Sequence, residues 1–128
     1  MKFILLIAGI LTGFATYAQH RPDAIVGKWI VIPKENFIIN VYHSTTGYSG
    51  KIASVKEQSK ANTIGFVIID GLKFDPKTGS WDKGKIHNPN NRTKYNASAK
   101  IKPDGVLEVR GSGAIKFIGA KRNFRRVQ

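Results

Sequence analysis

Short segments in which apolar and polar residues alternate dominate the chain after its first twenty-five or so residues. The clearest is segment 93–102: one face would carry Thr93, Tyr95, Ala97, Ala99 and Ile101, and the other Lys94, Asn96, Ser98, Lys100 and Lys102. A repeat of two residues predicts a half-buried β-strand. The sequence Pro103-Asp104-Gly105 then predicts a tight turn into the next strand, because Pro presets φ and Gly tolerates positive φ.

The same pattern predicts about eight strands along the chain. They cover residues 27–32, 37–41, 48–55, 66–74, 81–87, 93–102, 107–110 and 121–127. Segment 56–64 has no clear period and is expected to form a loop or one helical turn. Segment 65–74 is nearly continuously apolar, which is typical of a strand covered on both faces, and Gly71 indicates a bulge or bend.

Evenly spaced short strands with turns between them are typical of a β-sandwich or a β-barrel. Here the connections are short and no long crossover is needed. We therefore predict an all-β fold, a small up-and-down antiparallel β-barrel, because closure removes exposed strand edges.

The first 18 residues have the features of an export signal. Lys2 precedes an apolar run over residues 3–14, and Thr16 and Ala18 provide small residues at the −3 and −1 positions of a cleavage site. The run is shorter than the ~18–20 residues that span a bilayer, so a retained anchor is the less favoured alternative. We expect residues 1–18 to be a signal peptide and residues 19–128 to form a single barrel domain, periplasmic or secreted.

The chain is strongly basic and contains no cysteine. Its formal net charge is +13, and loss of Lys2 with the leader would lower it to +12. Such a surface attracts anionic lipid headgroups, acidic polysaccharide or nucleic acid, although basic composition also serves solubility. Export would make nucleic acid an unexpected partner. The absence of cysteine excludes disulfides, thiolate catalysis and a lipidated N-terminal cysteine.

No pattern in the sequence predicts catalysis, a cofactor or a metal. Ser49 lies among glycines but lacks the spacing of a nucleophile elbow, and the glycines of segment 111–119 lack the Lys-Ser/Thr of a phosphate loop. His43 and His87 could meet at one barrel mouth, but no third ligand is evident. We therefore expect a protein that is not an enzyme.

Several segments, taken in order, resemble the bacterial domain-of-unknown-function 2147 family. They are IVGKW (25–29), YSGKI (48–52), GKI (84–86) followed by Asn88-Pro89, LEVRG (107–111) and FRRV (124–127). The resemblance implies an exported bacterial protein with a lipocalin-like (calycin) barrel, and it implies no activity. The chain departs from the family pattern at Phe124, where Trp is usual, and after Pro89, where Asn90-Asn91-Arg92 replaces a simple Gly-Lys turn.

The resemblance also implies a role for Gly27, Trp29 and Arg126. In lipocalin-like barrels the Trp of the Gly-x-Trp motif plugs one end, and an Arg from the last strand packs across its ring. Trp29 and Arg126 (or Arg125) are placed for this contact, which is worth roughly 0.5–2 kcal/mol.

Two functions remain open. The first is binding of a small apolar or amphipathic anionic ligand at the open barrel end, with Phe37, Ile39, Tyr95 and Ile101 facing inward and room left by Gly50, Gly84, Ala97 and Ala99. Its candidate polar contacts are Tyr42, Tyr48, Lys85, His87 and Arg110.

The second function is that of a cell-envelope interaction protein without a ligand pocket. Its basic outer face would bind anionic lipid or polysaccharide through Lys94, Lys100, Lys102, Lys116, Lys121, Arg122 and Arg125. A cavity of ~300 Å³ or more would favour the first function, and a closed apolar core would favour the second.

The leader generates a direct prediction. Mass spectrometry of the protein isolated from its native host should find an N-terminus at Gln19 or a near neighbour, because Ala18 completes the cleavage site. An intact Met1 in a cytosolic fraction would contradict export.

Overall fold

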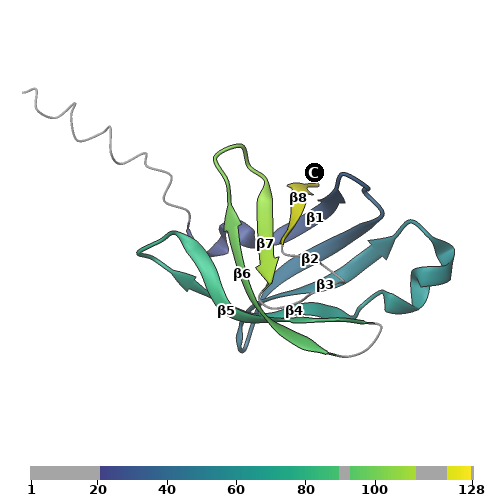
Figure 1. Cartoon of the computed structure of the whole chain (residues 1–128), viewed down its shortest axis with the longest axis horizontal. Coiled ribbons are helices and arrows are strands. Elements are labelled where there is room, and N and C mark those ends of the chain that lie inside the picture. The colour runs from purple at the N-terminus through teal and green to yellow at the C-terminus, as the bar shows by residue number, and fades with distance from the viewer. Residues whose placement is uncertain (1–20, 90–92, 112–120, 128) are drawn as a thin grey trace, which may run out of the picture.

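The computed structural model describes residues 21–89, 93–111 and 121–127, and within them the chain forms a closed barrel of eight antiparallel strands (Figure 1). The strands are β1 (Gly27–Ile32), β2 (Phe37–Ser44), β3 (Gly47–Val55), β4 (Val67–Asp75), β5 (Ser80–His87), β6 (Lys94–Ile101), β7 (Leu107–Gly111) and β8 (Lys121–Arg126). Each strand pairs with the next, and β8 pairs with β1. The predicted up-and-down barrel is confirmed. The predicted leader and Lys116 lie outside the described residues.

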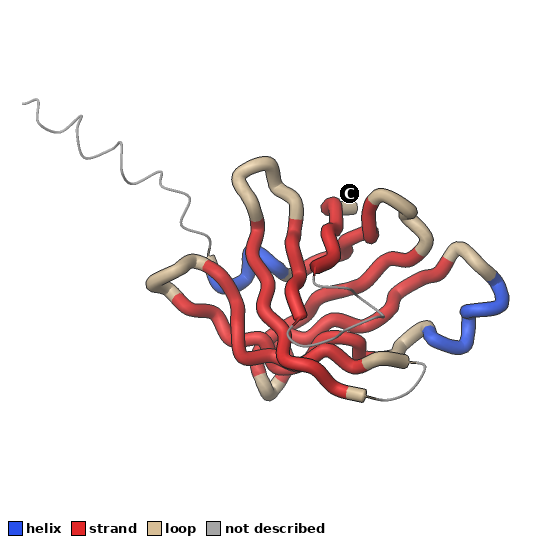
Figure 2. The backbone as a smooth tube through the Cα atoms, in the orientation of Figure 1, coloured by secondary structure: helices blue, strands red, loops and turns tan. Residues whose placement is uncertain are grey.

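Two short 3-10 helices accompany the strands. Helix η2 (Pro22–Ile25) precedes β1, and helix η3 (Gln58–Thr63) connects β3 to β4. Figure 2 shows the two helices on opposite sides of the barrel. Helix η3 accounts for the segment that the sequence assigned to a loop or one helical turn. No helix in the described part of the chain is long and apolar enough to cross a bilayer.

The core follows the alternation of the strands. In β6 the residues Ala97 and Ala99 are buried, and Tyr95 and Ile101 pack against the buried cluster. The small residues do not leave the room that the sequence suggested. A Cβ atom added to Gly84 would lie 2.8 Å from the Leu72 side chain, so the centre of the barrel is already filled there.

Strand β4 corrects one prediction. The continuous apolar run over 65–74 predicted a strand covered on both faces. Ile68 and Ile69 are indeed both buried although they are consecutive. The register between β3 and β4 slips twice: Gly50 pairs with Ile69, whereas Lys51 pairs with Val67. The extra residues of β4 are bulges, and the bulge next to Gly71, with its φ of 71°, is the irregularity that this glycine indicated. Both isoleucines therefore face one core.

Helix η2 closes one end of the barrel. Trp29 and Trp81 are fully buried beneath it. The Trp29 indole Nε1 donates to the Ile25 carbonyl oxygen at 2.9 Å, and the Trp81 Nε1 donates to the Pro22 carbonyl oxygen at 3.0 Å. Each indole thus packs its carbon atoms against the core and donates its N–H to the η2 backbone. A buried Trp needs such a partner for its N–H group.

Arg126 fastens the same closure from the last strand. Its guanidinium carbon lies 4.1 Å from the centroid of the Trp29 ring, while its Nη1 and Nη2 donate to the carbonyl oxygens of Val26 and Ala24 at 2.8 and 2.7 Å. Gly27 leaves space for this arginine, because a Cβ there would lie 2.8 Å from Nη1 and its φ of +130° is unfavourable for other residues.

Trp29→Ala should lower the free energy of unfolding by ~3–5 kcal/mol, because a large, fully buried ring is lost from the core. Urea denaturation followed by circular dichroism measures the change. Ile64→Ala, at a side chain that is 50% exposed, is the control and should cost less than ~1 kcal/mol. A Trp29→Ala protein that melts within a few degrees of the parent would contradict the sealing role of this ring.

Candidate functional site

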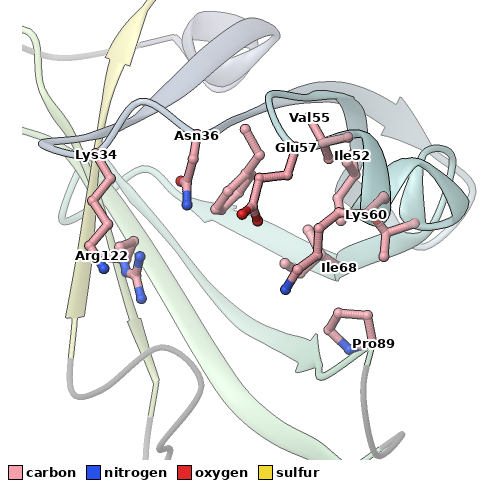
Figure 3. Close-up of a pocket in the computed structure, with 11 residues that line it drawn as sticks. Lys34, Asn36, Ile52, Val55, Glu57, Lys60, Ile68, Pro89 and Arg122 are labelled. Carbon is pink, nitrogen blue, oxygen red and sulfur yellow. The ribbon is translucent and has the colours of Figure 1, made fainter.

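The other end of the barrel contains a cavity of about 250 Å³ (Figure 3). Its walls come from the β1–β2 connection, the end of β3, helix η3, the start of β4, the residues after β5 and the start of β8. In an up-and-down barrel all of these segments lie at the same end. The cavity is therefore the mouth of the barrel, opposite the end that η2 closes.

The inner part of the cavity is apolar. Ile52 and Ile68 are buried, and Phe37 and Val55 are partly exposed beside them. The Phe37 ring is held edge-on against Phe124, with 6.1 Å between ring centroids and an interplanar angle of 76°. This geometry is favourable for aromatic pairs, so the floor of the cavity is fixed by core packing.

The rim of the cavity is cationic. Figure 3 shows the side chains of Lys34 and Arg122 together on one side, and those of Glu57 and Lys60 across from them. Asn36 adds an amide between the two groups. Three cationic groups thus face one carboxylate. No ion pair within the described residues engages Lys34, Glu57 or Lys60.

Strand β8 brings Arg122 to the mouth. Phe124 is buried in the core, and residues two positions before and after it face the same way. Arg122 and Arg126 therefore both face the barrel axis, one at each end. The prediction that Arg122 belongs to the outer face is wrong, because this side chain lines the mouth cavity. Lys121 and Arg125 do lie outside.

The five residues predicted as ligand contacts are not brought together. Tyr48 faces inward, but at the closed end: its hydroxyl donates to Asp23 Oδ1 at 2.7 Å, and its ring lies 4.9 Å from that of His43. Tyr42 faces outward on β2, with Lys51 Nζ 5.4 Å from its ring centroid. Neither tyrosine lines the mouth cavity.

The other three predicted contacts project from the outer surface of the barrel. Lys85 and His87 alternate with the buried Ile86 on β5, and Lys85 Nζ donates to Asn96 Oδ1 at 2.6 Å. Arg110 on β7 donates through Nε to Glu108 Oε2 at 2.6 Å. These residues had suitable chemistry near strand ends, but their strand phase directs them away from the cavity.

The two histidines considered for a metal site lie at opposite ends of the barrel. His43 is near the end of β2, at the closed end, whereas His87 ends β5 at the mouth. No group of three or more His, Asp or Glu side chains suited to a metal ion occurs among residues 21–89, 93–111 and 121–127.

Comparisons with known proteins agree on the fold. The family model described as "Uncharacterized protein conserved in bacteria (DUF2147)" matches residues 27–126. The chain is also similar to a solved structure, protein HP1028 from the human pathogen Helicobacter pylori, which is described as belonging to the lipocalin family. That similarity has 15% sequence identity and a TM-score of 0.62, and covers 81% of this chain and 83% of the other. No curated protein matches the chain. At this identity the structural likeness establishes the lipocalin-like fold alone.

The closed end has a distinct pH dependence. Burial, reinforced by the hydrogen bond to Asp23, raises the pKa of Tyr48 to about 12 from its ordinary value of 10.0. Since the folded state favours the protonated phenol, its stabilisation is complete below pH 10 and is lost as the pH rises through about 12. Between pH 10 and pH 12 the free energy of unfolding, measured by chemical denaturation, should fall more steeply for the parent than for Tyr48→Phe.

If the free energies of the two proteins fall in parallel over this range, the pKa of Tyr48 is not raised by folding.

Proposed function

The chain belongs to the DUF2147 family of bacterial proteins, and we propose that this member binds a small amphipathic anion at the open end of its barrel. One observation carries the proposal. An apolar floor made by Phe37, Ile52 and Ile68 lies beneath a rim with three cations and one carboxylate. An apolar group in the floor and an anionic head at the rim would match both parts.

The charge of the rim supports an anion over a neutral or cationic ligand. Lys34 and Arg122 lie together, and Figure 3 shows their nitrogen atoms facing the same space. An arginine can bind a carboxylate or phosphate through two parallel hydrogen bonds, and a neighbouring lysine adds a compact charge. Glu57, on the far side of the rim, would direct the anionic head toward this pair by repulsion.

The size of the cavity restricts the ligand. A volume of about 250 Å³ is just below the ~300–1,000 Å³ of typical small-molecule pockets. It is also below the ~300 Å³ set above as the size that would favour ligand binding. The ligand would therefore be small, or it would bury one end and leave the rest in solvent.

We favour binding over catalysis for this site. Among the described residues that line it, the one hydroxyl is that of Thr63, and it donates to the Lys60 carbonyl oxygen at 2.7 Å. A nucleophile activated by an adjacent base needs a different arrangement. The predicted leader supports export, so the ligand would be met in the periplasm or outside the cell.

A nuclear magnetic resonance titration with octanoate tests the proposal, with 1-octanol and octylamine as probes of matched chain and different charge. Octanoate should shift the resonances of Phe37, Ile52 and Ile68 and bind more tightly than either control. The double variant Lys34→Gln/Arg122→Gln should weaken octanoate binding about tenfold, since one exposed and one partly exposed cation are removed.

A matched control removes the same charge elsewhere. The variant Lys28→Gln/Lys51→Gln changes two exposed lysines outside the cavity and should bind octanoate like the parent. Octylamine binding as tight as octanoate, or equal losses in the two double variants, would refute anion recognition at the mouth.

A further inference from the structure

We propose that the outer surface of β5, β6, β7 and β8 is a second binding site, which holds a linear acidic polysaccharide. We call it the outer cationic face. It consists of five exposed cations: Lys85, Lys94, Lys100, Arg110 and Lys121. The proposal does not depend on a ligand at the mouth, because none of these residues lines the cavity.

The strand register gathers these cations on one surface. Arg110 pairs with Lys121 on β8 and with Ser98 on β6, which places two cations side by side across adjacent strands. Lys94 pairs with His87 of β5, further toward the mouth. Adjacent strands lie ~4.8 Å apart, so the cations form a continuous strip across four strands. In Figure 1 β5, β6 and β7 follow one another along this side of the barrel.

Few acids lie next to the strip. Asp70 of β4 pairs with Lys85 at one edge of the strip, and Asp82 lies on β5. At the centre of the strip the acid is Glu108, whose side chain is 4% exposed. Glu108 accepts a hydrogen bond from Arg110 at 2.6 Å, and its carboxylate lies 4.0 Å from the Lys121 ammonium. The side chains of Arg110 and Lys121 are 54% and 49% exposed. Glu108 therefore offsets part of the charge of Arg110 and Lys121, but both cations remain about half exposed to solvent.

The rest of the barrel exterior is different. On β1 and β2 the outward positions include Ile30, Ile32, Ile38 and Tyr42, and Ile30 pairs directly with Ile38. The exposed lysines of β1–β4 are Lys28, Lys51 and Lys73, one on each of three strands. Exposed cations are thus denser on β5–β8 than on the first half of the barrel.

The residues between the cations favour a polysaccharide over a bilayer. On β6 they are Asn96 and Ser98, an amide and a hydroxyl that can bond to sugar hydroxyls. No outward apolar side chain interrupts β6, because Tyr95, Ala97 and Ala99 face the core. Peripheral membrane binding gains strength from buried apolar area as well as charge, and this face offers charge alone.

The direct test measures binding of polygalacturonate to the full chain, with neutral dextran as the uncharged control and vesicles containing phosphatidylglycerol as the lipid control. Polygalacturonate should bind, dextran should not, and affinity should fall as salt rises because exposed charges are screened. Saturating octanoate should leave a polygalacturonate complex, which separates this site from the mouth.

Matched charge variants locate the site. Lys85→Gln/Lys94→Gln/Lys100→Gln should weaken polygalacturonate binding about tenfold, since each exposed ionic contact contributes modestly. Lys28→Gln/Lys51→Gln/Lys77→Gln loses the same charge outside the face and should bind like the parent. Equal losses in both triple variants would show that net charge alone is responsible. No polygalacturonate binding, or tighter binding to the vesicles, would also overturn the proposal.

Discussion

The structure depends on the pairing of β1 with β8, which turns an open sheet into a barrel. Trp29 and Arg126 lie directly opposite each other in this pair, and the guanidinium covers the indole ring. The same arginine donates one hydrogen bond to Ala24 within η2 and another to Val26, which joins η2 to β1. The backbone pairing of β1 with β8 closes the sheet, while the Arg126 side chain satisfies carbonyl groups at the barrel end and fixes η2 beside Trp29. No exposed strand edge is left at this seam.

Because one end of the barrel is closed and its interior is filled, a ligand would enter the cavity at the other end. The interior is filled by Trp29, Trp81 and the aliphatic core, and even the glycine positions on β3 and β5 are in contact with neighbouring side chains. Space remains where the strands diverge toward η3, between side chains that come from connections as well as strands. A small ligand would thus rest on the core rather than pass through the barrel. This explains why the cavity is small although the fold is lipocalin-like.

Much of the fold could be predicted because it depends on local patterns. Alternation over 93–102, the turn at Pro103-Asp104-Gly105 and the Gly-x-Trp motif each specify structure within a few residues. The bulges of β4 were harder, since Ile68 and Ile69 are consecutive and only the slip against β3 shows that both face the core. The second sealing ring, Trp81, was missed because its hydrogen bond to Pro22 joins residues 59 positions apart.

The candidate site was less predictable for a physical reason. Lys34, Asn36, Glu57 and Lys60 lie in or beside connections, where no period indicates the direction of a side chain. Arg122 lies in a strand of mostly polar residues, and Phe124 alone defines which side faces the core. Predicted contacts such as Lys85 and Arg110 had the right chemistry but the opposite strand phase. A signal was present in the spacing of Arg122, Phe124 and Arg126, which share one face.

The start of β8 shows how one strand serves both charged regions. Lys121 and Arg122 are neighbours in sequence, so they face opposite sides: Lys121 joins the outer cationic face and Arg122 joins the mouth. Two adjacent side chains of a strand lie within the ~8–10 Å over which charges interact at physiological ionic strength. An anion bound at the mouth would therefore lower the positive potential at the nearest edge of the outer face. The two regions differ in shape and in the ligands they fit, but they share electrostatic potential along this strand.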